Sequence, residues 1–314
     1  MLAIYGTGAM VPIYLDGLVG AGIAADEIVV VGRREDAARS IAARYGAHAA
    51  QIGHESEHRP TAAIIVVTPS ALPALTRRAL DAGVRKVLVE KPGALSSGEL
   101  SKLHDTVTAA GATAHVVFQR RFLPSVVRCR DLIREDGGAV ACFFEMTEVE
   151  QHVLSLRENQ NWPQENFARW GLVNPIHVLD LALWLVGRPV QITPCREGAL
   201  SWHPSGATFS GTGKSDTGTA LVYLATWGTA GRWRIEVTTR KQRLFLCPLE
   251  TLDQQLSGSF AVTKVDVAAE PAGMKPGFAG LVNDFLASDG PSCLPDLNAA
   301  AQLLGTAEHI FGYA

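Results

Sequence analysis

The feature that most constrains the fold is a pair of glycines at the very start of the sequence. Gly6-Thr7-Gly8 follows a short apolar run, Leu2–Tyr5, and precedes a segment of helical character. Gly6 permits a tight turn, and Gly8 lets the backbone approach a bound pyrophosphate, which the amide groups of a helix N-terminus bind. The motif alone also fits a simple glycine-rich turn. Its position at the head of a strand–helix series favours a dinucleotide site.

Strand-length apolar runs alternate with helical segments over the first third of the sequence. The later runs are Glu27–Val31, Ala62–Val67, Lys86–Glu90 and Ala114–Phe118. Strands that alternate with helices predict a parallel sheet with helices on both faces. We therefore predict an α/β architecture that begins with a Rossmann dinucleotide-binding domain over residues 1–120.

The pattern changes after Phe118. One strong helix is predicted over Pro175–Val186, and strand signals dominate from Val190 onward. Two strand-like runs, Leu221–Trp227 and Trp233–Thr239, are separated by a glycine-containing turn, which is typical of an antiparallel sheet. We predict an α+β domain over residues 121–314.

Composition and charge exclude several classes of protein. Charged residues make up 19% of the chain and the formal net charge is −3, without a block of like charges, so neither nucleic acid nor an anionic membrane is an expected partner. The apolar runs are too short for a membrane span, and the motif at Gly6 leaves no room for a signal peptide. The cysteines lack metal-ligand spacing. We therefore predict a cytoplasmic protein without a metal. The five cysteines are Cys129, Cys142, Cys195, Cys247 and Cys293.

Two arginines follow the second predicted strand. Gly32-Arg33-Arg34 stands where a carboxylate would bind the ribose diol of NAD. A guanidinium group instead suits the 2′-phosphate of NADP. The alternative is a solvated helix start, at which Glu35 and Asp36 favour the helix dipole. We predict NADP(H) as the preferred cofactor and NAD(H) as the second option.

A lysine ends another predicted strand. Glu90-Lys91-Pro92 closes the run that begins at Lys86. The carboxyl ends of parallel strands line the ligand crevice, and an ammonium group there can donate to a developing alkoxide during hydride transfer. Pro92 also allows a cis peptide bond. Without further context, an exposed lysine before a turn is the commoner interpretation.

Together these motifs resemble the glucose–fructose oxidoreductase / inositol dehydrogenase family over nearly the whole chain. The resemblance implies a Rossmann domain, then an α+β domain whose open, mostly antiparallel sheet often forms an oligomer interface. It implies tightly held NAD or NADP and oxidation or reduction of sugars, cyclitols or related molecules. It assigns contacts with cofactor and substrate to Lys91, and an acid or base role to His177. It rests on Gly6-x-Gly8, Thr68-Pro69, Glu90-Lys91-Pro92, His177-x-x-Asp180 and Leu185-Val186-Gly187.

The chain departs from this family at one position. Many members have an aspartate four residues before the histidine, whereas this chain has Val173, followed by Asn174, which cannot shuttle protons. A lysine–aspartate–histidine relay is therefore not expected. Two further segments, Gln119–Phe122 and Leu200–Pro204, resemble oxidoreductases of bacterial surface-glycan and antibiotic-sugar pathways.

The predicted helix at 175–186 carries the candidate proton donor. Asn174 is a good N-cap, Pro175 suits the first helical position, and His177 and Asp180 then share one face. A neutral imidazole can donate a hydrogen bond to a substrate oxygen or accept a proton from a hydroxyl group. A histidine satisfied within a partly buried helix is the alternative.

Other residues are candidates for substrate contact. Arg121 follows the last Rossmann strand and can hold a carboxylate, phosphate or hydroxyl group. Trp162, Trp170 and Trp202 can form a stacking wall for a sugar ring, although core packing is the better interpretation of each alone. His203 is either a ligand contact or an ordinary loop residue.

These observations define one predicted site. The predicted catalytic residues are Lys91 and His177. The predicted cofactor-binding residues are Gly6, Thr7, Gly8, Ala9, Met10, Arg33, Arg34, Thr68, Pro69, Glu90, Lys91 and Pro92. The predicted substrate-binding residues are Arg121, Asn174, His177, Asp180 and Trp162.

The function we predict is that of an NADP(H)-preferring oxidoreductase acting on a C–OH/C=O centre. Its substrate would be a sugar, nucleotide-sugar or cyclitol-like molecule of a bacterial glycan or secondary-metabolite pathway. A reductase of C=N bonds and a non-catalytic dinucleotide-binding regulator are the alternatives. Because both faces of Leu221–Trp227 are largely apolar, we also predict a homodimer or homotetramer.

Overall fold

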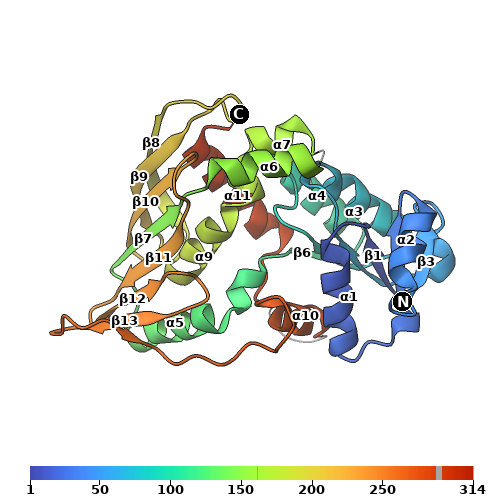
Figure 1. Cartoon of the computed structure of the whole chain (residues 1–314), viewed down its shortest axis with the longest axis horizontal. Helices are drawn as coiled ribbons and strands as arrows, with labels where there is room; N and C mark the ends of the chain where they lie inside the picture. Colours follow the sequence, from blue (N-terminus) through green and yellow to red (C-terminus); the bar gives the residue numbers. More distant parts are fainter. Residues whose placement is uncertain (161, 288–291, 314) are drawn as a thin grey trace. The chain divides into compact units, whose positions relative to one another are not determined.

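The structure, a computed structural model, describes residues 1–160, 162–287 and 292–313, and it folds as two compact units (Figure 1). The first unit comprises Met1–Gln119 and Pro271–Leu304, and the second comprises Arg120–Glu270 with the chain from Gly305 onward. The sequence suggests a division into 1–120 and 121–314; in the structure, residues 271–304 instead return to the first unit. No helix within the described ranges is both long and apolar enough to cross a membrane.

Close packing of two helices explains this return. Helix α10, Phe278–Leu286, has an apolar face, and this face is buried against α1, Met10–Gly20. A side chain at Gly17 of α1 would place its Cβ 2.9 Å from a methyl group of Val282, so glycine is what permits the contact. The backbone N–H of Val116 also donates to the carbonyl oxygen of Pro295 at 3.0 Å.

The first unit contains the predicted Rossmann-type sheet. Its six strands are all parallel, in the order β3-β2-β1-β4-β5-β6. The strands are β1 Leu2–Tyr5, β2 Ile28–Gly32, β3 His48–Gln51, β4 Ala62–Ile65, β5 Lys86–Val89 and β6 Thr113–Val116. The strand β3, with the sequence His-Ala-Ala-Gln, carries no apolar run and was not predicted.

A side-chain cap marks the start of one helix of the first unit. The hydroxyl oxygen of Ser96 accepts a hydrogen bond from the Glu99 amide at 3.2 Å, which caps α4. Helix α4 spans Ser97–Ala109. The other helices are α2 Glu35–Ala42, α3 Leu72–Asp81 and α11 Leu297–Phe311, the last of which runs on into the second unit. The short 3-10 helices are η1 Ala25–Glu27, η2 Glu55–His58 and η3 Pro69–Ala71, and a fourth, η4 Gln119–Phe122, crosses from the first unit into the second.

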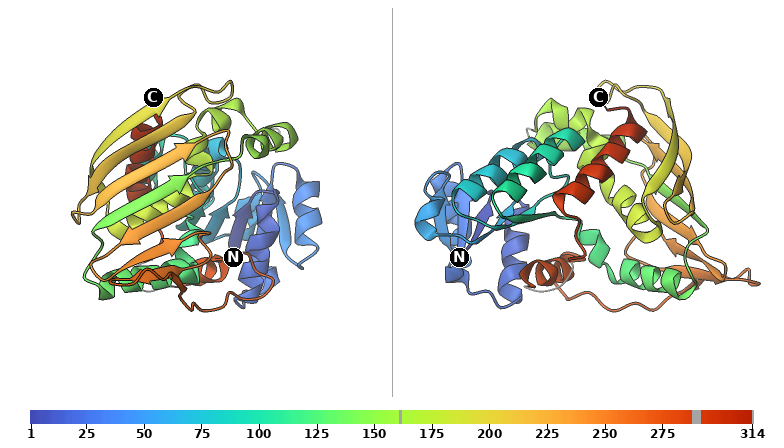
Figure 2. Two further views of the ribbon diagram at one scale, coloured as in Figure 1. Left: turned by 60° about the vertical axis from the view of Figure 1, so that its left-hand side comes forward. Right: turned by 180° about the vertical axis from the view of Figure 1, so that it is seen from behind.

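The second unit is built on a mixed, mostly antiparallel sheet, seen face-on in Figure 2 (left). Its order is β14-β13-β12-β11-β7-β10-β9-β8. The strands are β7 Ala141–Met146, β8 Pro189–Glu197, β9 Thr208–Ser215, β10 Ala220–Thr226, β11 Trp233–Thr238, β12 Gln242–Leu246, β13 Asp253–Leu256 and β14 Thr263–Lys264. The helices are α5 Pro124–Glu135, α6 Glu150–Gln160, α7 Gln164–Ala168, α8 Trp170–Val173 and α9 Ile176–Val186.

The two strands on either side of the predicted turn are not neighbours. The strand β7 lies between them, antiparallel to β11 and parallel to β10, with Cys142 opposite both Leu221 and Val237. Cys142, Phe144 and Met146 alternate with less buried residues along β7. The buried side chains of this central strand therefore lie on the inner face of the sheet, beside those of β10 and β11.

The two faces of this sheet differ. Helix α9 packs against β7 and β11 and covers the inner face. The outer face carries Phe143, Val222 and Leu224, together with an ion pair between Arg234 and Glu145 at 2.9 Å. Val222 is 42% exposed, so part of this apolar surface faces solvent in the isolated chain.

An aromatic cluster fills one end of the inner face and encloses His203. The His203 ring lies edge-on to Phe209, Trp227 and Tyr313, with centroids 5.6–5.7 Å apart. Its Nδ1 bonds the Gly206 carbonyl oxygen at 2.8 Å, and its Nε2 bonds the hydroxyl group of Tyr313 at 2.7 Å. Burial lowers the pKa of His203 to about 4. His203 is thus a loop residue, as the second interpretation holds, and it is also buried and neutral within the core.

This histidine predicts a pH dependence of stability. Between its ordinary pKa of about 6.5 and about 4, the unfolded chain binds a proton that the folded unit does not. The free energy of unfolding should therefore fall with decreasing pH across this window, by about 2 kcal/mol at pH 5 relative to pH 7. His203→Gln should remove that part of the slope. Urea titration followed by tryptophan fluorescence measures it, because all six tryptophans lie in the second unit. Equal slopes for both proteins would contradict the assignment.

Candidate active site

The glycine turn after β1 has the geometry that a dinucleotide requires. Gly6 has φ +139°, and a Cβ at this position would collide with the carbonyl oxygen of Val66. Its amide donates to the carbonyl oxygen of Val31 at 2.8 Å. The turn is thus held between the ends of β2 and β4, in a conformation open only to glycine.

The surface above this turn is open. Thr7, Gly8 and Ala9 are exposed immediately before α1 begins, and a Cβ built on Gly8 meets no atom within 4 Å. A Cβ at Gly32 would lie 2.8 Å from the Thr7 methyl group, so this glycine keeps the end of β2 close to the turn. An open, glycine-lined helix start fits a pyrophosphate.

The two predicted phosphate-binding arginines stand in different situations. The Nε of Arg34 donates to the Asp36 carboxylate at 3.1 Å, in an exposed ion pair. This contact raises the pKa of Arg34 and lowers that of Asp36. Arg33, also exposed, makes no ion pair with any described residue. The structure thus offers Arg33 as the more available guanidinium.

The lysine at the end of β5 lies in a turn that Glu90 organises. The peptide bond between Lys91 and Pro92 is cis. The Tyr14 hydroxyl donates to Glu90 Oε1 at 2.6 Å, and the Lys91 amide donates to Glu90 Oε2 at 3.2 Å. Burial, and then the Glu90 charge, raise the pKa of Tyr14 well above its usual value. Helix α1 and the lysine turn are therefore joined through one carboxylate.

Three predicted cofactor segments come from adjacent strands. Thr68-Pro69 follows β4, which pairs with β1 on one side and with β5 on the other. The carboxyl ends of these three neighbouring strands thus carry the glycine turn, Thr68-Pro69 and Lys91, all at the same end of the sheet.

In the second unit, Arg121 and Asp180 pair with each other. Arg121 Nε donates to Asp180 Oδ2 at 2.9 Å, and a second bond joins its Nη2 to Oδ1. Burial raises the pKa of Asp180, and the Arg121 charge opposes that shift. The Arg121 guanidinium also lies 5.5 Å from the centre of the Trp184 ring. Two nitrogens of the Arg121 guanidinium thus bond to the protein itself, and the Asp180 carboxylate is their acceptor.

Asn174 and His177 lie at the start of α9, although not as the sequence predicts. The cap position belongs to Pro175, and the side chain of Asn174 donates instead to Glu148 Oε1 at 3.0 Å. His177 is only 5% exposed, and its ring centre lies 6.2 Å from that of Trp233. The prediction of Asn174 as an N-cap was wrong, because a buried carboxylate offers its amide a charged acceptor.

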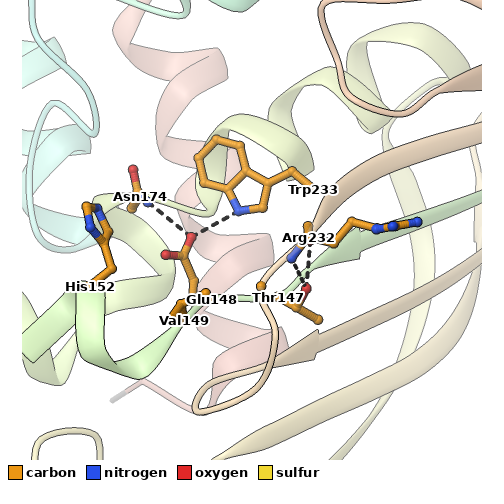
Figure 3. Close-up of a pocket in the computed structure, with 8 residues that line it drawn as sticks. Thr147, Glu148, Val149, His152, Asn174, Arg232 and Trp233 are labelled. Carbon is orange, nitrogen blue, oxygen red and sulfur yellow. Dashed lines mark hydrogen bonds between the residues drawn. The ribbon is translucent and has the colours of Figure 1, made fainter.

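A pocket of about 280 Å³ opens beside this group (Figure 3). Asn174 is a predicted site residue that lines it. The sequence interpretation missed Glu148, His152 and Trp233, although the pair Glu148 and Glu150 at the end of an apolar run was a usable signal for the first. The lining residues are Thr147, Glu148, Val149, His152, Asn174, Gly231, Arg232 and Trp233.

Of the three tryptophans predicted to stack on a sugar ring, two lie in the core and one is half-buried. Trp170 and Trp202 are 1% exposed; the first stacks on Phe167, and the second donates to Glu150 at 2.9 Å. Trp162 is half-buried, with its ring centre 6.2 Å from that of Phe167. Two of the three are thus core residues, the interpretation that the sequence favoured for each.

Part of the first unit is similar to a known family. Residues 2–118 match the oxidoreductase family with an NAD-binding Rossmann fold, which is the glucose–fructose oxidoreductase / inositol dehydrogenase group. This match confirms the family resemblance over the dinucleotide-binding part of the chain. No curated protein matches the sequence.

Solved structures share the fold over almost the whole chain. The UDP-N-acetylglucosamine 3-dehydrogenase of Acidithiobacillus ferrooxidans has 19% identity and a TM-score of 0.79, over 99% of this chain and 96% of that one. A putative NADPH-dependent oxidoreductase of Desulfitobacterium hafniense has 14% identity and a TM-score of 0.82, over 99% and 94%. A putative myo-inositol dehydrogenase of Sinorhizobium meliloti has 18% identity and a TM-score of 0.73, over 98% and 94%.

Proposed function

We propose that this chain, a member of the oxidoreductase family with an NAD-binding Rossmann fold, transfers hydride between NADP(H) and a C–OH/C=O centre of a sugar, nucleotide-sugar or cyclitol-like molecule. The observation that supports the proposal is the position of Lys91 just after β5, at the same carboxyl end of the parallel sheet as the open glycine turn. The substrate class is supported by similar structures named as dehydrogenases of a nucleotide sugar and of myo-inositol.

Each candidate residue has a defined task in this proposal. A bound nicotinamide supplies or accepts the hydride. The ammonium group of Lys91 donates to the substrate oxygen on which charge develops. The imidazole of His177 accepts the hydroxyl proton during oxidation and returns it during reduction. Glu90 keeps the lysine turn beside α1 through its bond with Tyr14.

The direct test is turnover. The purified chain is incubated with NADP⁺ or NAD⁺ and a panel of UDP-N-acetylglucosamine, myo-inositol and free sugars, and absorbance at the wavelength of the reduced nicotinamide is followed. We expect reduction of the nicotinamide with at least one member. Binding of the dinucleotide without turnover on this panel or on the corresponding keto compounds would contradict the proposed chemistry.

Cofactor preference depends on Arg33 and Arg34. Replacing both with alanine should weaken NADPH binding by about one to three orders of magnitude, because charge-assisted bonds to the 2′-phosphate are lost. NADH binding should change little. Since Arg34 already pairs with Asp36, Arg33→Ala alone should account for most of the loss. Fluorescence titration of both cofactors measures this, and tighter binding of NADH than of NADPH by the unmodified protein would refute the preference.

We also propose that the chain is a homodimer or homotetramer, assembled through the outer face of the large sheet. The apolar residues Phe143, Val222 and Leu224 favour burial there. Val222→Arg should shift the protein to a monomer at micromolar concentration, as light scattering would record. A monomeric unmodified protein would refute the assembly. Cytoplasmic location stays a prediction.

A further inference from the structure

A buried carboxylate lines the pocket of the second unit. Glu148 follows β7 and is 5% exposed. Its Oε1 accepts hydrogen bonds from Asn174 Nδ2 at 3.0 Å and from Trp233 Nε1 at 2.9 Å (Figure 3). The two donors belong to Asn174, which lies between α8 and α9, and to Trp233, the first residue of β11. Three separate segments of the chain therefore fix this one side chain.

Such an arrangement is energetically demanding. Burying an ionised carboxylate costs free energy that its hydrogen bonds and neighbouring charges must offset. The two donors converge on the same oxygen atom, and Figure 3 shows the other oxygen turned away from both. The contacts thus orient the carboxylate within the pocket wall.

The rest of the pocket suits a hydroxylated ring. Trp233 contributes an indole, whose ring also lies 5.0 Å from the Arg120 guanidinium, and His152 and Asn174 add polar groups. A few convergent polar groups on an aromatic wall are typical of small-molecule sites. A carboxylate can only accept hydrogen bonds, so it recognises hydroxyl groups as donors.

We propose that Glu148 is a substrate-binding residue, whose carboxylate accepts hydrogen bonds from hydroxyl groups of a polyhydroxylated ring held in this pocket. The inference rests on the proposed function for the identity of the substrate, and it names the polar anchor that holds that substrate. It assigns recognition to Glu148 and leaves proton transfer to His177.

The test is binding, measured apart from turnover. Glu148→Gln keeps the shape of the side chain and an oxygen that can accept from Asn174 and Trp233, but it removes the charge. Glu150→Gln is the matched control, because Glu150 also accepts from an indole, that of Trp202, and does not line the pocket. Calorimetric titration with myo-inositol and with N-acetylglucosamine, with and without NADP⁺, gives the affinities.

We expect Glu148→Gln to weaken the binding of at least one of these probes about ten- to hundredfold, the loss typical of a hydrogen bond to a charged group. Glu150→Gln should leave it within about twofold. NADPH affinity should not change in either variant. Glu148→Asp, which keeps the charge on a shorter side chain, should give an intermediate affinity and serves if the glutamine variant does not fold.

Unchanged affinity in Glu148→Gln would overturn the inference, as would a failure of both probes to bind the unmodified chain. Failure of NADPH to bind would instead contradict the proposed function. A polyol affinity that depends on Glu148 would support the inference even then, so the two failures are distinguishable.

Discussion

Replacing His177 with alanine is expected to lower kcat by about two to four orders of magnitude, the usual loss when a general acid or base is removed. His177 lies in the first turn of α9, and only 5% of its surface is exposed to solvent. Affinity for NADPH, measured separately by fluorescence, should stay close to that of the unmodified enzyme. Steady-state kinetics on the substrate found by the turnover screen gives kcat.

The controls for this variant separate chemistry from packing. His54→Ala removes an exposed imidazole that pairs with Glu57, and it should leave kcat unchanged. Asp180→Asn tests stability, because it leaves the Arg121 guanidinium without its charged partner; removal of one member of a buried pair typically costs about 3–5 kcal/mol. A His177→Ala enzyme with near-normal kcat would remove His177 from the mechanism and leave Lys91 or a bound water as the proton carrier.

Replacing Lys91 with alanine is expected to lower kcat by roughly two to three orders of magnitude, since a preorganised donor to the developing charge is lost. Because Glu90 keeps its bond with Tyr14, the turn itself should persist, and the cofactor should still bind. Lys91→Arg should rescue little, since a planar guanidinium does not reproduce the position of an ammonium group.

The matched control is Lys102→Ala, which removes an exposed lysine from α4 of the same unit. It should leave both kcat and KM unchanged. If Lys91→Ala raised KM but spared kcat, the lysine would bind ground state and transition state equally, and its proposed role in charge stabilisation would be wrong.

Most of the first unit could be predicted from the sequence because its signals are local. The strand β1 matches the apolar run Leu2–Tyr5 residue for residue, and the predicted run that begins at Lys86 forms β5. The edge strand β3 was missed because His48–Gln51 carries no apolar pattern, and its conformation comes from pairing with β2.

The second unit shows where local patterns stop being sufficient. A glycine turn between two strand-like runs indicated neighbours, yet β7, about 80 residues earlier in the chain than β10, lies between them. Pairing strands so far apart in the chain depends on which strands pack together against α9, and no short stretch of sequence encodes that choice.

The glycine turn, the lysine at a strand end and the family resemblance were all determined by the sequence, because each depends on a few consecutive residues whose conformation is set locally. The partners of the polar side chains were decided only by the tertiary structure. Arg121 meets Asp180 across 59 residues, and Glu148 meets Trp233 across 85. A buried charge takes the donors that packing brings within hydrogen-bond distance, and that distance is a property of the folded chain.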